Sequence, residues 1–158
     1  MKNIKYFLIF ICISLSISSF AQNKVCSGIE YSTDKLFYRA TSNGTSMDIT
    51  ASKKKARSNA RNAIITQISA NIESSINRQN CEDIYKKKMM ELSMIAIRQE
   101  AGNIKTICEN SNLENKKYVS DVVVELNKEI IIKGIIAQIE NDNTLKGLFD
   151  ADHFKKSL

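Results

Sequence analysis

The chain has 158 residues, with 23 lysines and arginines against 17 aspartates and glutamates, and its formal net charge is +6. It contains four cysteines, no proline and one histidine, His153, which excludes a histidine cluster for metal binding or acyl transfer. The lysine runs at 53–55 and 86–88 have no aromatic residues between them for base stacking. We therefore interpret them as solvated helix faces and expect no nucleic-acid partner.

The first 21 residues have the three features of a secretory signal peptide. Lys2 and Lys5 give the basic start, residues 6–17 form the apolar run, and Ser19 and Ala21 are the small residues before the cut. Serines dilute the run, which favours cleavage over a permanent span of about 20 apolar residues. We expect cleavage after Ala21 and export to the periplasm or out of the cell.

The exported chain of roughly 137 residues is long enough for one domain with its own core. Its polar first segment, 22–35, is predicted to be a flexible leader. Neither Cys12, inside the apolar run, nor Cys26 follows a lipidation motif, so no lipid anchor is expected. The remaining basic excess would suit an anionic envelope surface, and contact with a membrane surface without a span stays open.

Aromatic and extended-favouring residues at 36–41 predict a strand, and Ser42-Asn43-Gly44 predicts a turn after it. Asp48 or Thr50 could then cap a long helix over 50–78. Its apolar positions recur every four residues and grade from alanine to isoleucine, as expected for a helix laid across a twisted sheet. They are Ala56, Ala60, Ile64, Ile68, Ile72 and Ile76.

A second helix is predicted over 82–101, with a left-handed cap at Gly102-Asn103. Its expected apolar positions are Ile84, Met89, Leu92, Ile95 and Ala96. Strands at 104–109 and 118–126, joined by a polar turn at 110–116, should form a hairpin.

A third helix at 128–140 is apolar almost all round, which predicts that it is buried or forms half of an interface. Residues 141–158 form a polar C-terminal tail. The order β-α-α-β-β-α predicts an α+β domain with helices packed on one face of a small antiparallel or mixed three-stranded sheet. The first strand could join either edge of the hairpin.

The run Phe37-Tyr38-Arg39-Ala40-Thr41-Ser42-Asn43-Gly44, followed by Ala51, Ala56, Asn59-Ala60-Arg61, Ile64 and Ile68, resembles the strand and helix motif of the LPP20-type lipoprotein family. Residues 103–109 and 116–126 resemble that family's closing hairpin. The resemblance implies an LPP20-like α+β domain over 36–140 in an envelope protein, with no catalytic residues to carry over. The chain departs from the family in lacking the lipidation cysteine and in having Ser42 where glycine is expected.

Three cysteines follow the predicted signal, and an exported protein can form disulfides. The predicted topology brings Cys26, Cys81 and Cys108 to one end of the domain. Because a flexible leader can meet the strict separation that a bridge demands, we expect Cys26 to pair with Cys81, with Cys108 as the alternative partner.

Two arginines one helical turn apart, Arg57 and Arg61, are the candidate anion contact, although pairing with acidic neighbours is the more economical interpretation. Asp121 and Glu125 would lie about 13 Å apart along a strand, too far for a catalytic carboxylate pair. We therefore expect no catalytic residue, no cofactor and no metal site.

The leading hypothesis is a non-enzymatic exported or envelope-associated protein that acts through protein-protein contacts as a homo-oligomer. The alternative is a module that binds a small molecule or anion between sheet and helices. A thiol-dependent enzyme is the third hypothesis and would need a reactive, exposed cysteine.

Overall fold

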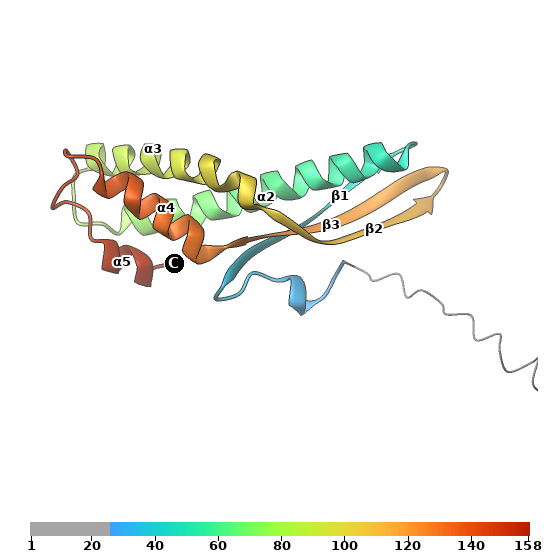
Figure 1. Ribbon diagram of the computed structural model, residues 1–158, viewed down its shortest axis with the longest axis horizontal. Helices are drawn as coiled ribbons and strands as arrows, with labels where there is room; N and C mark the ends of the chain where they lie inside the picture. The colour runs from blue at the N-terminus through green and yellow to red at the C-terminus, as the bar shows by residue number, and fades with distance from the viewer. Residues whose placement is uncertain (1–25) are drawn as a thin grey trace, which may run out of the picture.

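The computed structural model describes residues 26–158 and confirms the α+β prediction. The predicted signal peptide and its cut site lie outside these residues. In Figure 1 the three strands occupy one half of an elongated molecule and most of the helical structure the other half, while the long helix α2 (Ile49–Asn77) runs through both. The predicted order of elements is confirmed, and a short helix, α5 (Ala151–Lys156), follows them.

The sheet is antiparallel throughout, and its strand order is β1-β3-β2. The strands are β1 (Phe37–Ser46), β2 (Lys105–Glu114) and β3 (Lys117–Asn127). The first strand thus joins the β3 edge of the hairpin. Only Asn115 and Lys116, with φ of 48° and 64°, connect β2 to β3, a two-residue turn that suits the twist of the strands. The polar turn predicted over 110–116 is wrong, because most of that segment continues the ladder.

The turn predicted at Ser42-Asn43-Gly44 is also wrong, since these residues continue β1. Gly44 pairs with Ser120 of β3 and lies beneath α2. A Cβ atom there would be 2.5 Å from both the Ser52 carbonyl oxygen and the Ala56 amide nitrogen. The glycine therefore permits close contact between strand and helix rather than a reversal of the chain.

Helix α2 begins at the predicted cap, where the Asp48 side chain accepts a hydrogen bond from the Ala51 amide at 2.7 Å. The predicted stripe of alanines and isoleucines is confirmed, because all six side chains are buried. The stripe covers the sheet first and then continues into the helical half, where α2 packs against α3 (Asp83–Glu100).

The bounds predicted for the second helix are close to those of α3, and the predicted burial of Met89 and Ala96 is confirmed, with Leu92 partly buried against the core. The other two predicted apolar positions are wrong. Ile84 and Ile95 are 70% and 44% exposed. The buried positions are Met89, Ser93, Ala96 and Ile97. No left-handed cap ends this helix, because the chain passes into a 3-10 turn, η2 (Ala101–Asn103).

The described part of the predicted leader, residues 26–35, makes defined contacts with the sheet. A 3-10 turn, η1 (Ile29–Tyr31), lies on the sheet face opposite α2. Cys26, Tyr31, Cys108 and Val123 form a small buried cluster there. The sheet is thus covered on its second face as well, at the end where the leader folds back.

Helix α4 (Lys128–Glu140) has the predicted bounds and follows β3 without a loop. Its buried positions are Ile131, Ile135, Ile136 and Ile139. The tail packs against the core through Leu145 and Phe154. Gln79 fixes the start of α5, since its amide group donates to the Asp150 carbonyl and accepts from the Asp150 amide. Within residues 26–158, no helix is both long and apolar enough to cross a membrane.

Candidate functional site

The disulfide joins Cys26 to Cys108, with Cα atoms 5.6 Å apart, so the expected pairing with Cys81 is wrong and the alternative partner is correct. Cys81 has a free thiol and is half-buried. The 29 residues of α2 span about 43 Å at 1.5 Å per residue, whereas a ten-residue strand spans about 33 Å. The helix therefore carries Cys81 past the end of the sheet, away from the other two cysteines.

A local irregularity in β2 explains why Cys108 faces the leader. The register of β2 against β3 shifts between Thr106 and Cys108, which sets Cys108 opposite the buried Val123. The next residue, Glu109, then lies opposite Val122 and meets α2. The bulge thus directs Cys108 to one face of the sheet, where it forms the disulfide, and Glu109 to the other face, where it pairs with Arg57.

Arg57 and Arg61 do not converge on an anion. The Arg57 guanidinium donates to Glu109 at 2.6 Å, and Lys53 lies 3.2 Å from the same carboxylate. Partial burial opposes ionisation of Glu109, but these two cations outweigh it and lower its pKa. Arg61 instead donates to the Ala101 carbonyl at 2.6 Å. The favoured interpretation, pairing with an acidic neighbour, is confirmed for Arg57, whereas Arg61 bonds to a backbone carbonyl. Both arginines thus tie α2 to neighbouring segments.

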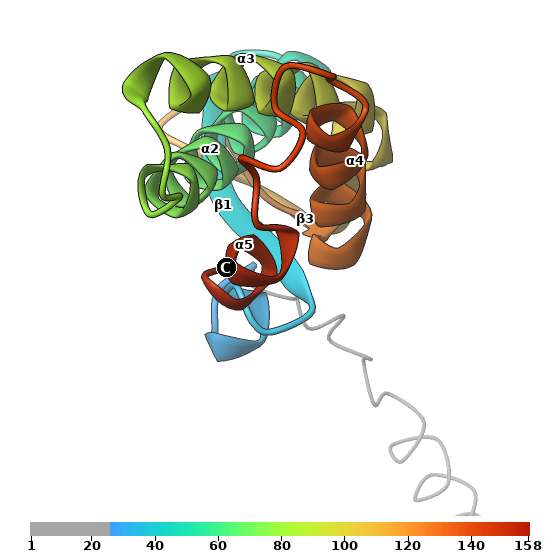
Figure 2. The same ribbon diagram turned by 90° about the vertical axis from the view of Figure 1, so that its left-hand side faces the viewer.

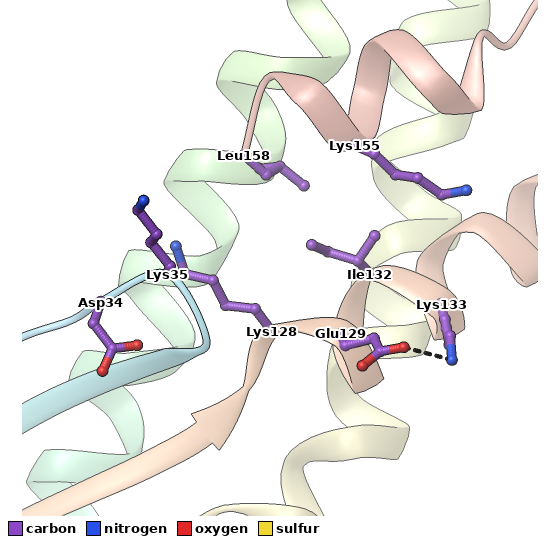
Figure 3. Close-up of a pocket in the computed structure, with 8 residues that line it drawn as sticks. All are labelled: Asp34, Lys35, Lys128, Glu129, Ile132, Lys133, Lys155 and Leu158. Carbon is purple, nitrogen blue, oxygen red and sulfur yellow. Dashed lines mark ion pairs between the residues drawn. The ribbon is translucent and has the colours of Figure 1, made fainter.

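The most promising site is a cavity of about 720 Å³ where the leader, α4 and α5 meet (Figure 3). We name it the lysine cavity. It is lined by Asp34, Lys35, Lys128, Glu129, Ile132, Lys133, Lys155 and Leu158. In Figure 3 the Ile132 and Leu158 side chains point toward one another across the middle of the cavity, and Lys35 and Lys128 extend toward one flank.

Backbone hydrogen bonds bring the three segments together. The Lys128 amide donates to the Leu36 carbonyl at 2.9 Å, which joins the first residue of α4 to the residue before β1. Asn127 caps α4 by accepting from the Ile130 amide. Because β3 leads directly into this helix, the first turns of α4 present Lys128 and Ile132 beside the leader.

The leader is held at the cavity by contacts independent of the disulfide. Thr33 Oγ1 accepts from the Arg39 amide at 2.9 Å and donates to the Arg39 carbonyl. Asp34 accepts from the Leu36 and Phe37 amides and pairs with the Arg39 guanidinium at 2.6 Å. These amide hydrogen bonds, with the help of Arg39, lower the Asp34 pKa. The carboxylate is thus ionised, and its oxygens are bonded to the Leu36 and Phe37 amides and to Arg39.

The charges in the lysine cavity are only partly compensated. Glu129 pairs with Lys133 at 2.7 Å, which lowers the Glu129 pKa. Lys155 lies 3.9 Å from Asp152 on its own helix. Within the described chain, neither Lys35 nor Lys128 has a carboxylate within 4 Å, so both ammonium groups remain available.

Lys128 has an aromatic neighbour instead of an acid. Its Nζ lies 4.7 Å from the centre of the Tyr38 ring. Burial raises the Tyr38 pKa, so the ring stays neutral and its face attracts the ammonium without cancelling the charge. This contact holds Lys128 at the edge of the cavity while leaving it able to bind an anion.

The arrangement has the chemistry of a binding site. Isoleucine and leucine supply an apolar floor, and lysines supply cations at the rim. Among residues 26–158, no three histidine, cysteine or acidic side chains are grouped closely enough to hold a metal ion. A small molecule with an apolar body and an anionic head fits this chemistry.

Sequence reasoning missed the lysine cavity because its residues come from three separate segments. No local spacing connects Lys35, Lys128 and Lys155. The one signal in the sequence was α4, which has more apolar residues than one buried face of a helix needs. Ile132 is not among the buried positions of this helix and lies in the cavity floor.

Comparison with models of known protein families gave no match for this chain, and comparison with curated proteins gave none either. The resemblance to the LPP20-type family therefore stays a prediction.

Proposed function

We propose that this protein is a non-enzymatic exported binding protein and that the lysine cavity takes a small amphipathic anion. The observation that carries this proposal is that one cavity combines an apolar floor with two ammonium groups, those of Lys35 and Lys128, that have no carboxylate partner among residues 26–158. The anionic head would contact Lys35 and Lys128, and the apolar body would lie over Ile132 and Leu158. A volume of about 720 Å³ falls within the range of roughly 300–1,000 Å³ common for small-molecule sites.

Two observations support export. The sequence begins with the features of a signal peptide, and the Cys26–Cys108 disulfide requires an oxidising compartment to persist. A ligand-binding role without catalysis fits the sequence, whose one histidine is exposed on α5. We propose a periplasmic or secreted location on these grounds.

Isothermal titration with decanoate tests the proposed ligand class. Decanoate should bind with measurable heat, whereas decanol, which lacks the charge, should bind more weakly. A Lys35→Gln/Lys128→Gln variant should lose about fivefold to tenfold in decanoate affinity, because each exposed charge contact contributes up to about 1 kcal/mol.

The matched control is Lys87→Gln, which removes an exposed lysine on α3 away from the cavity. It should bind decanoate as the parent protein does. Equal affinity for decanoate and decanol, or equal losses in the control and the double variant, would overturn the proposal.

A second candidate function is protein-protein contact in the cell envelope. It is favoured by the exposed apolar residues of α3, which the fold itself does not use. Protein partners, including a further copy of this chain, would dock there.

A further inference from the structure

Helix α3 presents an unpartnered groove on its outer side. The groove has a volume of about 440 Å³ and is lined by Lys87, Met90, Glu91, Met94, Ile95 and Arg98. These positions follow helical spacing, so they form one stripe along the helix. None of them lines the lysine cavity.

The apolar centre of the stripe is held in place from beneath. Met94 is partly buried against the core, and its sulfur lies 3.5 Å from the Ser69 hydroxyl oxygen, whose proton is donated to the Ile65 carbonyl at 2.8 Å. Ile95 beside it is 44% exposed. An ordered apolar strip at the surface of a helix is a common docking site for another helix.

The charges on either side of this centre are arranged symmetrically. Glu91 lies one turn before Met94 and Ile95, and Arg98 lies one turn after them. Neither charged side chain has an ion-pair partner within the described residues. Glu91 and Arg98 are seven positions apart, or about 10.5 Å along the helix axis.

We propose that two copies of this protein dimerise through antiparallel α3 helices around a two-fold axis at Met94 and Ile95. Glu91 of each copy then lies opposite Arg98 of the other, forming two equivalent ion pairs on either side of an apolar centre. The proposal rests on the protein-contact function and names its partner as a second copy of the chain.

Two other arrangements place like charges together. Parallel helices would bring Glu91 against Glu91 of the second copy. An antiparallel pairing shifted so that Lys87 lies opposite Arg98 of the second copy would place two cations against each other at each end of the contact. A register that pairs Lys87 with Glu91 of the second copy also joins opposite charges, but its two-fold axis would lie at the buried Met89 rather than at the exposed Ile95. The charges together with the apolar centre therefore select one orientation and one register.

Sedimentation velocity of the purified protein tests this dimer with charge exchanges. Glu91→Arg and Arg98→Glu should each raise the dimer dissociation constant by at least about tenfold, because each replaces two attractions by two repulsions. An equimolar mixture of the two variants should dimerise like the parent, since every repulsion becomes an attraction in the mixed pair. The Glu91→Arg/Arg98→Glu double variant should recover in the same way.

Lys87→Glu is the control, because Lys87 has no charged partner in the proposed register. Its dissociation constant should stay within about twofold of the parent value. Tighter dimerisation of Lys87→Glu would show the shifted register and overturn the proposal. So would a parent protein that stays monomeric at about 100 µM, or single variants whose mixture does not recover.

The decanoate affinity of the same variants separates the dimer from the ligand site. It should be unchanged in all of them. Loss of dimerisation with normal decanoate binding shows that the exchanges act on the α3 contact alone. Parallel loss of both would mean that the variants disturb the fold, and the proposed α3 contact would be rejected.

Discussion

Removal of the Cys26–Cys108 disulfide should be the largest destabilisation available without touching the main core. The bridge closes a loop with a sequence separation of 82 residues. In the chain-entropy treatment, opening a loop of this length lowers the free energy of unfolding by about 4.5 kcal/mol at 25 °C. Because the unfolded chain retains some structure, we expect a Cys26→Ser/Cys108→Ser variant to lose about 3–4.5 kcal/mol.

Urea denaturation followed by circular dichroism at pH 7 measures this loss. Circular dichroism suits the protein because the chain has no tryptophan. The urea dependence of the unfolding free energy should steepen in the variant, since the unbridged chain exposes more surface when it unfolds. The parent protein, once reduced, should unfold at nearly the same urea concentration as the variant.

The matched control is Cys81→Ser, which removes the free thiol and should cost less than about 1 kcal/mol. Two results would refute the reasoning. One is a bridge between Cys26 and Cys81 in peptide maps of the oxidised protein. The other is a Cys26→Ser/Cys108→Ser variant as stable as the oxidised parent.

Three further predictions concern the packing and the pH dependence of the fold. Gly44→Ala should lower the unfolding free energy by about 3 kcal/mol, because its Cβ would clash with the α2 backbone. Gly102→Ala, whose new Cβ has no atom within 4 Å, should be tolerated. Thermal unfolding of both variants checks this, and equal effects would contradict it. Ser120→Ala should cost about 1–2 kcal/mol in urea unfolding, because its buried hydroxyl bridges the hydroxyls of Ser111 and Ser52 at 2.7 and 2.6 Å, and an unchanged midpoint would contradict that role. Hydrogen bonds from the Thr144 hydroxyl and from Lys88 hold the Asp142 pKa at about 2, below its unfolded value of 3.8. The stabilisation from Asp142 is therefore present above about pH 4 and is lost as the pH falls toward 2. Stability measured across that interval should fall less steeply in Asp142→Asn, and an identical slope would argue against this linkage.

Repeating local patterns made much of the fold predictable. The spacing of small and branched residues every four positions identified α2 and its buried stripe, because one face of a long helix must meet the core. The alternation in 118–126 identified β3. Both patterns reflect burial along one element, which a single sequence records directly.

Contacts between distant segments were harder to predict. Gly44 was interpreted as a turn residue because its role depends on how closely α2 crosses the sheet. Ile84 and Ile95 were assigned to the core, although only packing against α2 and α4 decides which side of α3 is buried. The predicted pairing of Cys26 with Cys81 is wrong because the 29-residue helix α2 is longer than the ten-residue strand β1 and carries Cys81 beyond the sheet.

The candidate site shows the same limit more strongly. Arg57 and Arg61 were a candidate site because they lie one turn apart on one helix. In the structure Arg57 bonds to Glu109 and Arg61 to the Ala101 carbonyl, two partners far apart in the sequence from them. Lys35 and Lys128 are 93 positions apart in the sequence. They line one cavity at the point where the Lys128 amide bonds to the Leu36 carbonyl, just before β1. Such a site depends on the tertiary structure and leaves no local signal.

Chemical-shift mapping by NMR during a decanoate titration tests the central claim most directly. The account predicts saturable shifts concentrated at Lys35, Lys128 and Ile132, with the Lys35→Gln/Lys128→Gln variant requiring about fivefold to tenfold more decanoate to reach the same shifts. Saturable shifts centred on another surface, or no shifts at the lysine cavity up to the solubility limit of decanoate, would contradict it.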